Sequence, residues 1–173
     1  FYADAFDGYL PPMSQGGPST YTWCMAMADL KLIKSKTVKC PSSRITPAAN
    51  AVTQYPDYGV NYQLFISATG ATHSKSMKIS GARHPSRKML FIEGTQNDGS
   101  GSVNPDGRGY FRVGCDAALA STVSYARPGM RHSKLANVTH LDGHVQSWKL
   151  PNEAKTYLNF PFNQESEEAI SYI

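Results

Sequence analysis

Apolar residues recur every three to four positions between residues 20 and 34, which is the spacing of one face of an amphipathic helix. Lysines lie near the C-terminal end of this stretch, where the helix dipole favours positive charge. The pattern therefore predicts a helix over residues 20–34. The positions that recur at this spacing are Trp23, Met27, Leu30 and either Ile33 or Lys34.

The first twelve residues predict the end of a helix followed by a loop. Residues 1–7 suit a last helical turn, and Gly8, Pro11 and Pro12 would end it. Because the chain begins with Phe rather than Met, we expect an upstream segment in the full protein. Residues 1–12 are therefore expected to be the end of a helix and the loop that follows it.

Two stretches rich in aromatic and β-branched residues predict strands, at residues 58–68 and 88–93. The second stretch is preceded by Pro85 and Ser86 and closed by Gly94. Residues 96–109 form a polar run of turn-forming residues, which predicts a long loop.

The clearest local signal is a hairpin over residues 137–148. Asp142 and Gly143 separate two strand-like runs, and Asp-Gly there predicts a two-residue turn in which both residues have positive φ. In that register His140 and His144 lie on opposite faces and cannot readily bind one ion together. The face predicted to be buried carries Ala136, Val138, His140, Val145 and Ser147.

The composition is typical of one folded domain. Of 173 residues, 40% are hydrophobic and only 17% charged, which excludes a charge-rich disordered chain and a coiled coil. The net charge is +4, and basic residues cluster only between Lys31 and Lys39, so nucleic-acid binding is not indicated. No apolar run reaches the roughly 18 residues that span a bilayer. We expect a single domain over residues 1–173, with residues 150–173 as a C-terminal extension.

The three cysteines, Cys24, Cys40 and Cys115, leave at least one thiol free or paired outside the chain. No Cys-x-x-Cys pair is present, so a zinc finger or a dithiol redox motif has no support. Two alternatives remain open. Cys24 and Cys40 form a bridge if the compartment is oxidising, or all three cysteines are small buried apolar side chains.

The order of several motifs along the chain resembles a known family. His132 is followed by nine residues and then by Asp142 and Gly143, with Asn137 inside the interval. Upstream matches are residues 2–12, the run Lys-Cys-Pro-Ser that contains Cys40 and Pro41, the run Tyr-Gly-Val-Asn-Tyr at 58–62, and Pro-Ser at 85–86. Together they resemble the prepilin-like proteins that are named for the His, nine-residue, Asp-Gly signature (H-X9-DG).

This resemblance implies an α+β pilin-like domain, in which an antiparallel sheet packs with a helix. Members are similar to type IV pilins and to type II secretion pseudopilins, so the implied function is a structural subunit of an envelope filament. The implied partners are other pilin-like subunits, joined through an apolar N-terminal helix outside this chain, and a prepilin peptidase. The domain would be anchored in the inner membrane and lie in the periplasm, or be assembled at the cell surface. The fragment itself is expected to be monomeric.

Two positions depart from the family pattern and bear on chemistry. Glu93 stands where Asp is usual, and His140 where an aromatic residue is more common. Glu93, His140 and His144 could complete a ligand set with His132 and Asp142, but the spacing argues against it. We expect structural roles instead: Asp142 forms the turn, and the imidazole of His132 hydrogen-bonds loop backbone at the hairpin entry.

No nucleophile motif is recognisable, so we predict that the protein is not an enzyme and needs no cofactor. A calcium site remains an alternative in the polar loop, where Asp98 and Asp106 supply oxygen ligands without EF-hand spacing. The alternative function is an envelope or secreted carbohydrate-binding or ligand-binding module. Its binding face would carry aromatic residues from the set Tyr21, Trp23, Tyr58, Tyr62 and Trp148.

Overall fold

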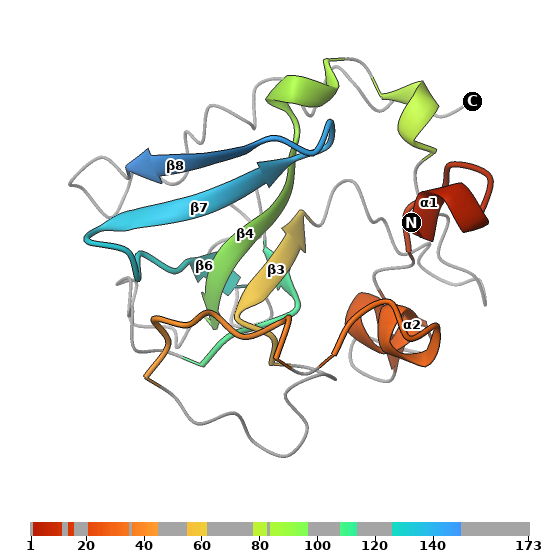
Figure 1. Cartoon of the computed structure of the whole chain (residues 1–173). Coiled ribbons are helices and arrows are strands. Elements are labelled where there is room, and N and C mark those ends of the chain that lie inside the picture. The colour runs from red at the N-terminus through yellow and green to blue at the C-terminus, as the bar shows by residue number, and fades with distance from the viewer. Residues whose placement is uncertain are drawn as a thin grey trace.

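The computed structural model describes residues 2–11, 14–15, 21–34, 36–44, 55–61, 78–82, 84–96, 108–113 and 126–149. Within these ranges, short helices lie beside one mixed β-sheet (Figure 1). The 3-10 helices are η2 (Ile79–Gly81) and η3 (Pro85–Arg87), and β1 (Ser14–Gln15) pairs with β2 (Tyr21–Thr22) in a separate two-stranded ribbon. The predicted mixture of helix and sheet is confirmed.

The main sheet is organised around β4 (Met89–Gln96). One edge of β4 pairs with β7 (Leu135–His140), which in turn pairs with β8 (Val145–Lys149), and all these pairings are antiparallel. Along the other edge of β4 lie β3 (Tyr58–Asn61) and then β6 (Ala126–Pro128), both antiparallel to β4. The strand predicted to stop at Gly94 continues to Gln96, because Gly94 itself pairs with Pro128 of β6.

The sheet is mixed rather than antiparallel throughout. The short strand β5 (Arg112–Val113) runs parallel to both β3 and β6. It pairs with the end of each strand and so joins them. The prediction of a purely antiparallel sheet was therefore wrong for β5. Its two residues carry no local signal of direction, since direction follows from which strands lie beside it.

Helix α2 (Trp23–Asp29) is shorter than the predicted helix over residues 20–34. At its start, Tyr21 and Thr22 belong to β2. At its end, Lys31 has φ +59°, and the amides of Lys31 and Leu32 donate to the carbonyl oxygens of Ala28 and Met27. This is a Schellman-type helix end with lysine in the position that glycine usually occupies. The sequence therefore has no glycine there that would predict the helix end.

The N-terminal residues form α1 (Tyr2–Ala5), which ends as the sequence predicts. Asp7 and Gly8 both have positive φ, and the Gly8 amide donates to the carbonyl oxygen of Ala3 at 2.6 Å. The glycine allows the left-handed backbone that turns the chain away from the helix. No described helix is long and apolar enough to cross a membrane.

The hairpin of β7 and β8 is present, but its register differs by one residue from the prediction. Ala136 pairs with Trp148 and Val138 with Gln146, which leaves Leu141, Asp142 and Gly143 as a three-residue loop. Only Gly143 has positive φ, at +92°. Such three-residue loops consist of a type I turn followed by a glycine in the left-handed conformation. The sequence Asp-Gly is compatible with this loop as well as with a two-residue turn.

The register shift changes which side chains share a face. Ala136, Val138 and His140 are buried, as predicted, but Val145 points away from them and is 63% exposed. Ser147 shares the opposite face with Asn137, to which its hydroxyl donates at 2.9 Å. The placement of Val145 and Ser147 on the core face was therefore wrong, because a slip of one residue turns a whole strand over.

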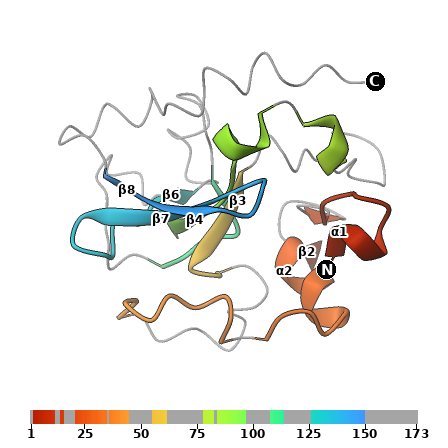
Figure 2. The same ribbon diagram turned by 45° about the horizontal axis from the view of Figure 1, so that its top comes forward.

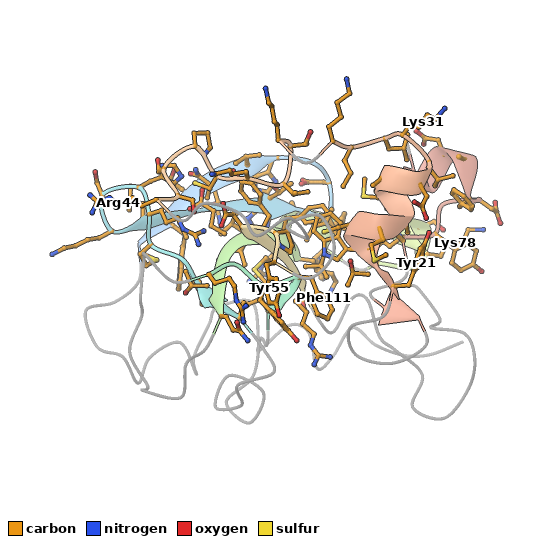
Figure 3. All side chains as sticks on the ribbon, turned by 90° about the horizontal axis from the view of Figure 1, so that it is seen from below. Tyr21, Lys31, Arg44, Tyr55, Lys78 and Phe111 are labelled. Carbon is orange, nitrogen blue, oxygen red and sulfur yellow. The ribbon has the colours of Figure 1, made fainter. Side chains whose placement is uncertain are left out.

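Apolar side chains bury both faces of the sheet. Phe91 packs on the α2 side, with its ring 5.0 Å from that of Trp23, whose indole donates to the carbonyl oxygen of Phe111. Phe111 belongs to the same apolar cluster and lies between the sheet and α2 (Figure 3). The next residue, Ile92, points to the other side and packs with Val138. Since side chains alternate along a strand, Glu93 returns to the α2 side. There it is covered by residues 36–44, which run beneath the sheet (orange in Figure 2).

Several predictions lie outside the described residues. They are the strand portion over 62–68, the polar loop over 97–107 with Asp98 and Asp106, the third cysteine Cys115, and the extension over 150–173.

Candidate functional site

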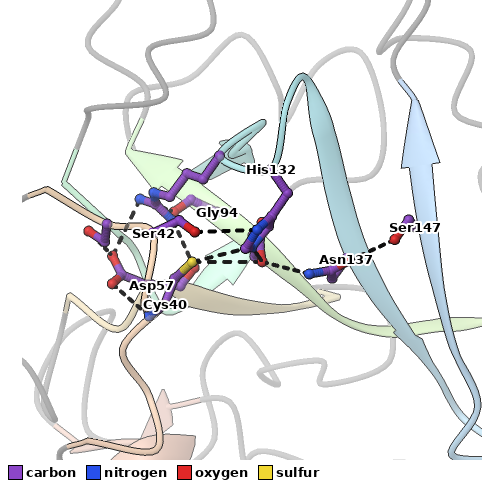
Figure 4. Close-up of polar contacts among 10 residues, drawn as sticks. Cys40, Ser42, Asp57, Gly94, His132, Asn137 and Ser147 are labelled. Atoms are coloured by element: carbon purple, nitrogen blue, oxygen red, sulfur yellow. Dashed lines mark hydrogen bonds and ion pairs between the residues drawn. The ribbon is translucent and has the colours of Figure 1, made fainter.

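A polar cluster on the α2 side of the sheet brings together residues from four segments. Glu93 comes from β4. Cys40 comes from the covering segment, His132 from the turn before β7, and Asn137 from β7 (Figure 4). We call these four residues the Cys-Glu-His-Asn cluster. The pairing of Ile92 with Val138 sets Glu93 beside Asn137, so sheet register positions two of the four members.

One oxygen of Glu93 is the centre of the cluster. Its Oε1 lies 2.6 Å from Nε2 of His132, accepts a hydrogen bond from Nδ2 of Asn137 at 3.2 Å, and lies 3.8 Å from Sγ of Cys40. The thiol sulfur is also 3.5 Å from Nε2 of His132. The second oxygen, Oε2, is buried and has no hydrogen-bond partner among the described residues.

The Cys40 end of the cluster is held by a turn. Pro41 is an exposed residue in this turn, which the Ser43 amide closes by donating to the carbonyl oxygen of Cys40 at 2.9 Å. Proline presets the backbone for the second position of such a turn. The turn brings Ser42 next to the histidine, with Oγ 3.4 Å from Nδ1 of His132. The Cys-Pro-Ser run is thus the local signal for this part of the site.

A buried ion pair supports the turn from the other side. The carboxylate of Asp57 accepts hydrogen bonds from the Cys40 amide at 3.0 Å and from the Ser43 hydroxyl at 3.3 Å. It also pairs with the guanidinium of Arg131 at 3.3 Å, and the Arg131 side chain is only 2% exposed. Arg131, the residue directly before His132, is therefore linked through Asp57 to the turn that carries Cys40.

Burial dominates the electrostatics of the cluster. It raises the pKa of Glu93, and the neighbouring His132 and Arg131 oppose this effect. Burial also raises the pKa of the Cys40 thiol. Tyr58 pairs with Glu93 across β3 and β4, and burial together with the charges of Cys40 and Glu93 raises its pKa to about 12. The site therefore disfavours uncompensated negative charge.

The geometry is unlike that of a cysteine nucleophile. In a Cys-His-acid triad the thiol and the carboxylate meet opposite nitrogens of the imidazole. Here Cys40 and Glu93 both face Nε2 of His132, whereas Nδ1 faces Ser42. The thiol is buried and its pKa is raised, which is the reverse of activation.

The structure brings together three of the six motif residues, namely Cys40, His132 and Asn137. Asp142 and Gly143 lie beyond the far end of β7, where Asp142 accepts a hydrogen bond from the His144 amide at 3.1 Å. The nine residues between His132 and Asp142 are a two-residue turn, the six residues of β7, and Leu141. The nine-residue spacing between His132 and Asp142 is thus set mainly by the length of β7.

Two expectations about histidines were wrong. The ring of His132 contacts the side chains of Glu93, Cys40 and Ser42, and only its backbone, which bridges to Leu135, secures the hairpin entry. His140 and His144 lie on the same face, where their rings stack at 4.1 Å. The cause is the shifted register, which makes them neighbours across the hairpin.

From the spacing in the sequence, we expected Glu93 not to share a site with His132, yet the structure places their side chains in contact. The available signal was a single acidic residue directly after an apolar strand run, in phase with Phe91. The two described cysteines, Cys24 and Cys40, are both buried free thiols, so the structure has no bridge between them.

The predicted set of binding aromatics does not form one surface. Trp23 is buried in the core on the α2 side, and Trp148 packs against the apolar cluster on the other side of the sheet. Comparison of the chain with protein-family models, with curated proteins and with solved structures found no match.

Proposed function

We propose that this chain is the globular domain of a pilin-like structural subunit, which assembles into an envelope filament through an apolar N-terminal helix. The proposal begins from the resemblance of its motifs to the H-X9-DG prepilin-like proteins. The observation that carries it is the convergence of these motifs. Cys40 and His132 lie 92 residues apart in sequence, yet their side chains meet around Glu93.

The cluster supports a mechanical role. Residues 36–44 contain no regular strand or helix, and they are attached to the sheet by Cys40, by Ser42 and by the bonds to Asp57. A loop without its own secondary structure depends on such side-chain bonds to stay in place. A filament subunit needs this rigidity, because its outer surface must keep one shape through assembly and mechanical load.

The proposed mechanism of assembly involves no bond-making chemistry. Apolar helices of neighbouring subunits would bury their surfaces against one another and supply most of the association energy. A prepilin peptidase would first remove the leader, and the domain would then face outward from the inner membrane. On this proposal the isolated 173-residue chain is a monomer, because its principal contact surface is the helix.

The test uses the full-length protein expressed in its native cells. The mature N-terminus is sequenced, the protein is localised by membrane fractionation, and filaments sheared from the cells are probed for it. The expected result is a processed N-terminus, an apolar segment of about 20 residues ahead of Phe1, and protein in both the membrane and the sheared fractions. Deletion of the peptidase should retain the leader and remove the protein from the sheared fraction.

A mature chain that is secreted free, with no apolar segment ahead of Phe1, would contradict the proposal. It would favour the alternative of a secreted binding module. Light scattering of the 173-residue chain gives an independent check, since a stable oligomer at micromolar concentration would mean that the domain itself holds the main assembly contact.

A further inference from the structure

Three different metal-ligating atoms converge in the Cys-Glu-His-Asn cluster. Sγ of Cys40, Oε1 of Glu93 and Nε2 of His132 all lie within 4.8 Å of one another. We propose that these three residues bind a divalent transition-metal ion of the zinc class. This inference goes beyond the proposed assembly function and does not depend on it.

The distances are close to those of a tetrahedral site. Zinc bonds of about 2.0 to 2.3 Å imply separations of about 3.3 to 3.6 Å between neighbouring ligand atoms. The Cys40 sulfur is 3.5 Å from Nε2 of His132 and 3.8 Å from Oε1 of Glu93, so both distances already approach this range. Only the 2.6 Å hydrogen bond between Glu93 and His132 must open, by about 0.7 Å, to admit the ion.

The outer contacts hold each ligand in place. Nδ1 of His132 faces the hydroxyl of Ser42 at 3.4 Å, which orients the imidazole with Nε2 toward the centre. Asn137 donates to Glu93, and the Cys40 amide donates to Asp57. Partners of this kind are what metal ligands use to fix their orientation and tautomer.

Charge balance also favours a cation. The Cys40 thiolate and the Glu93 carboxylate together neutralise a divalent ion, while the nearby charge of Asp57 is already matched by Arg131. Oε2 of Glu93 is buried and has no hydrogen-bond partner among the described residues. A cation bound to this carboxylate would offset the cost of burying its negative charge.

The donor types select the metal. A thiolate with an imidazole favours zinc or a similar transition metal, whereas calcium and magnesium favour oxygen ligands alone. Three protein ligands leave a fourth position for water. The His132 side chain is 32% exposed, whereas Glu93 is fully buried, so an ion would enter along the histidine edge.

The test uses the 173-residue chain, freed of metal with a chelator and titrated with Co²⁺ as a spectroscopic substitute for Zn²⁺. The expected result is one Co²⁺ per chain, with a thiolate-to-cobalt charge-transfer band and the visible bands of a tetrahedral site. Addition of Zn²⁺ should abolish these bands. Absence of the charge-transfer band in the wild-type protein at excess Co²⁺ would overturn the proposal.

Variants assign the ligands. Cys40→Ser should lose the charge-transfer band and weaken Zn²⁺ binding at least tenfold, and Glu93→Gln and His132→Gln should weaken it comparably. The matched controls are Cys24→Ser, a buried thiol away from the cluster, and His144→Gln, an exposed histidine; both should bind like the wild type. Cys115→Ser is also expected to bind normally. Retained binding in Cys40→Ser, or its loss in Cys24→Ser or Cys115→Ser, would refute the assignment.

X-ray absorption at the zinc edge of the wild-type protein keeps the proposal testable if a ligand variant fails to fold. The expected spectrum has one sulfur scatterer, with the remaining ligands nitrogen or oxygen. A coordination shell without sulfur, or with two sulfur atoms, would contradict the Cys40, Glu93 and His132 site.

Discussion

Oε1 of Glu93 lies 2.6 Å from Nε2 of His132, although the two residues are 39 positions apart in the sequence. Glu93 is fully buried, and His132 is partly exposed at the edge of the site. The histidine is therefore the closest polar partner of a carboxyl group that water cannot reach. This relationship connects the centre of the sheet to the turn that starts the terminal hairpin.

Removing the histidine should destabilise the domain. His132→Ala leaves Glu93 without its closest partner, so we expect the free energy of unfolding to fall by about 1 to 3 kcal/mol. A double-mutant cycle with Glu93→Gln, measured by denaturant unfolding in the presence of a chelator, should show a coupling of about 1 kcal/mol or more. The exposed pair of Lys78 and Asp7 is the control, and its coupling should be far smaller. Additive effects at Glu93 and His132 would contradict this account.

Glu93 should make stability fall as the pH rises. Because burial raises the pKa of Glu93, the folded protein keeps a proton on this carboxyl group that the unfolded chain has already released. The resulting stabilisation is complete below the ordinary glutamate pKa of about 4.3 and is lost as the pH rises through the raised value. Melting temperatures of wild type and Glu93→Gln across this range, with chelator present, measure it. A difference between the two proteins that does not change with pH would exclude the effect.

His140 should make stability fall as the pH falls, which is opposite to the effect of Glu93. Burial and the neighbouring His144 lower the pKa of His140, so the unfolded chain takes up a proton before the folded protein does. The stabilisation is complete above the ordinary histidine pKa of about 6.5 and is lost as the pH falls through the lowered value. His140→Phe, which cannot titrate, should remove this loss from the melting curves. The control is His84→Asn, at an exposed histidine, and it should lose stability at low pH as the wild type does.

Gly143 tests the hairpin loop. A Cβ at this position meets no atom within 4 Å, but the backbone has φ +92°, so only conformational strain opposes a side chain. We expect Gly143→Val to lower the free energy of unfolding by about 1 to 3 kcal/mol. Gly81→Ala is the control, because Gly81 also faces open space and its φ is not in the strained range. Equal melting temperatures for wild type and Gly143→Val would show that the loop is built differently.

Gly109 tests a close approach of two segments. A Cβ on Gly109 would overlap the carbonyl oxygen and carbon of Pro56, which are backbone atoms that a rotamer change cannot move. We expect Gly109→Ala to cost about 3 kcal/mol, measured by denaturant unfolding against Gly81→Ala. A stable Gly109→Ala protein would mean that residues 55–57 lie farther from residues 108–110 than described.

The helix α2 and the longer strands were predictable because their residue patterns are local, whereas the short strands β1, β2, β5 and β6 and the two 3-10 helices were not predicted. The three-to-four-residue spacing around Trp23 located α2, and the apolar run around Phe91, between Pro85-Ser86 and Gly94, located β4. The ends were less predictable, since Lys31 takes a left-handed backbone conformation that is uncommon for lysine. The hairpin was found at its correct place, but Asp142 and Gly143 suit two turn types whose registers differ by one residue.

The sequence by itself determined which residues belong to the site only as separate motifs. His132 and Asn137 were recognised from the spacing between His132 and Asp142, which reflects the length of a turn and a strand, and Cys40 was recognised from the Lys-Cys-Pro-Ser run. Only the tertiary structure decided that these side chains meet around Glu93, that β5 is parallel, and that His140 stacks on His144. The first two relationships depend on pairing between segments distant in sequence, and local periodicity carries no information about which distant segment lies beside which. The stacking of His140 on His144 depends on the hairpin register, which Asp142 and Gly143 leave open between two turn types.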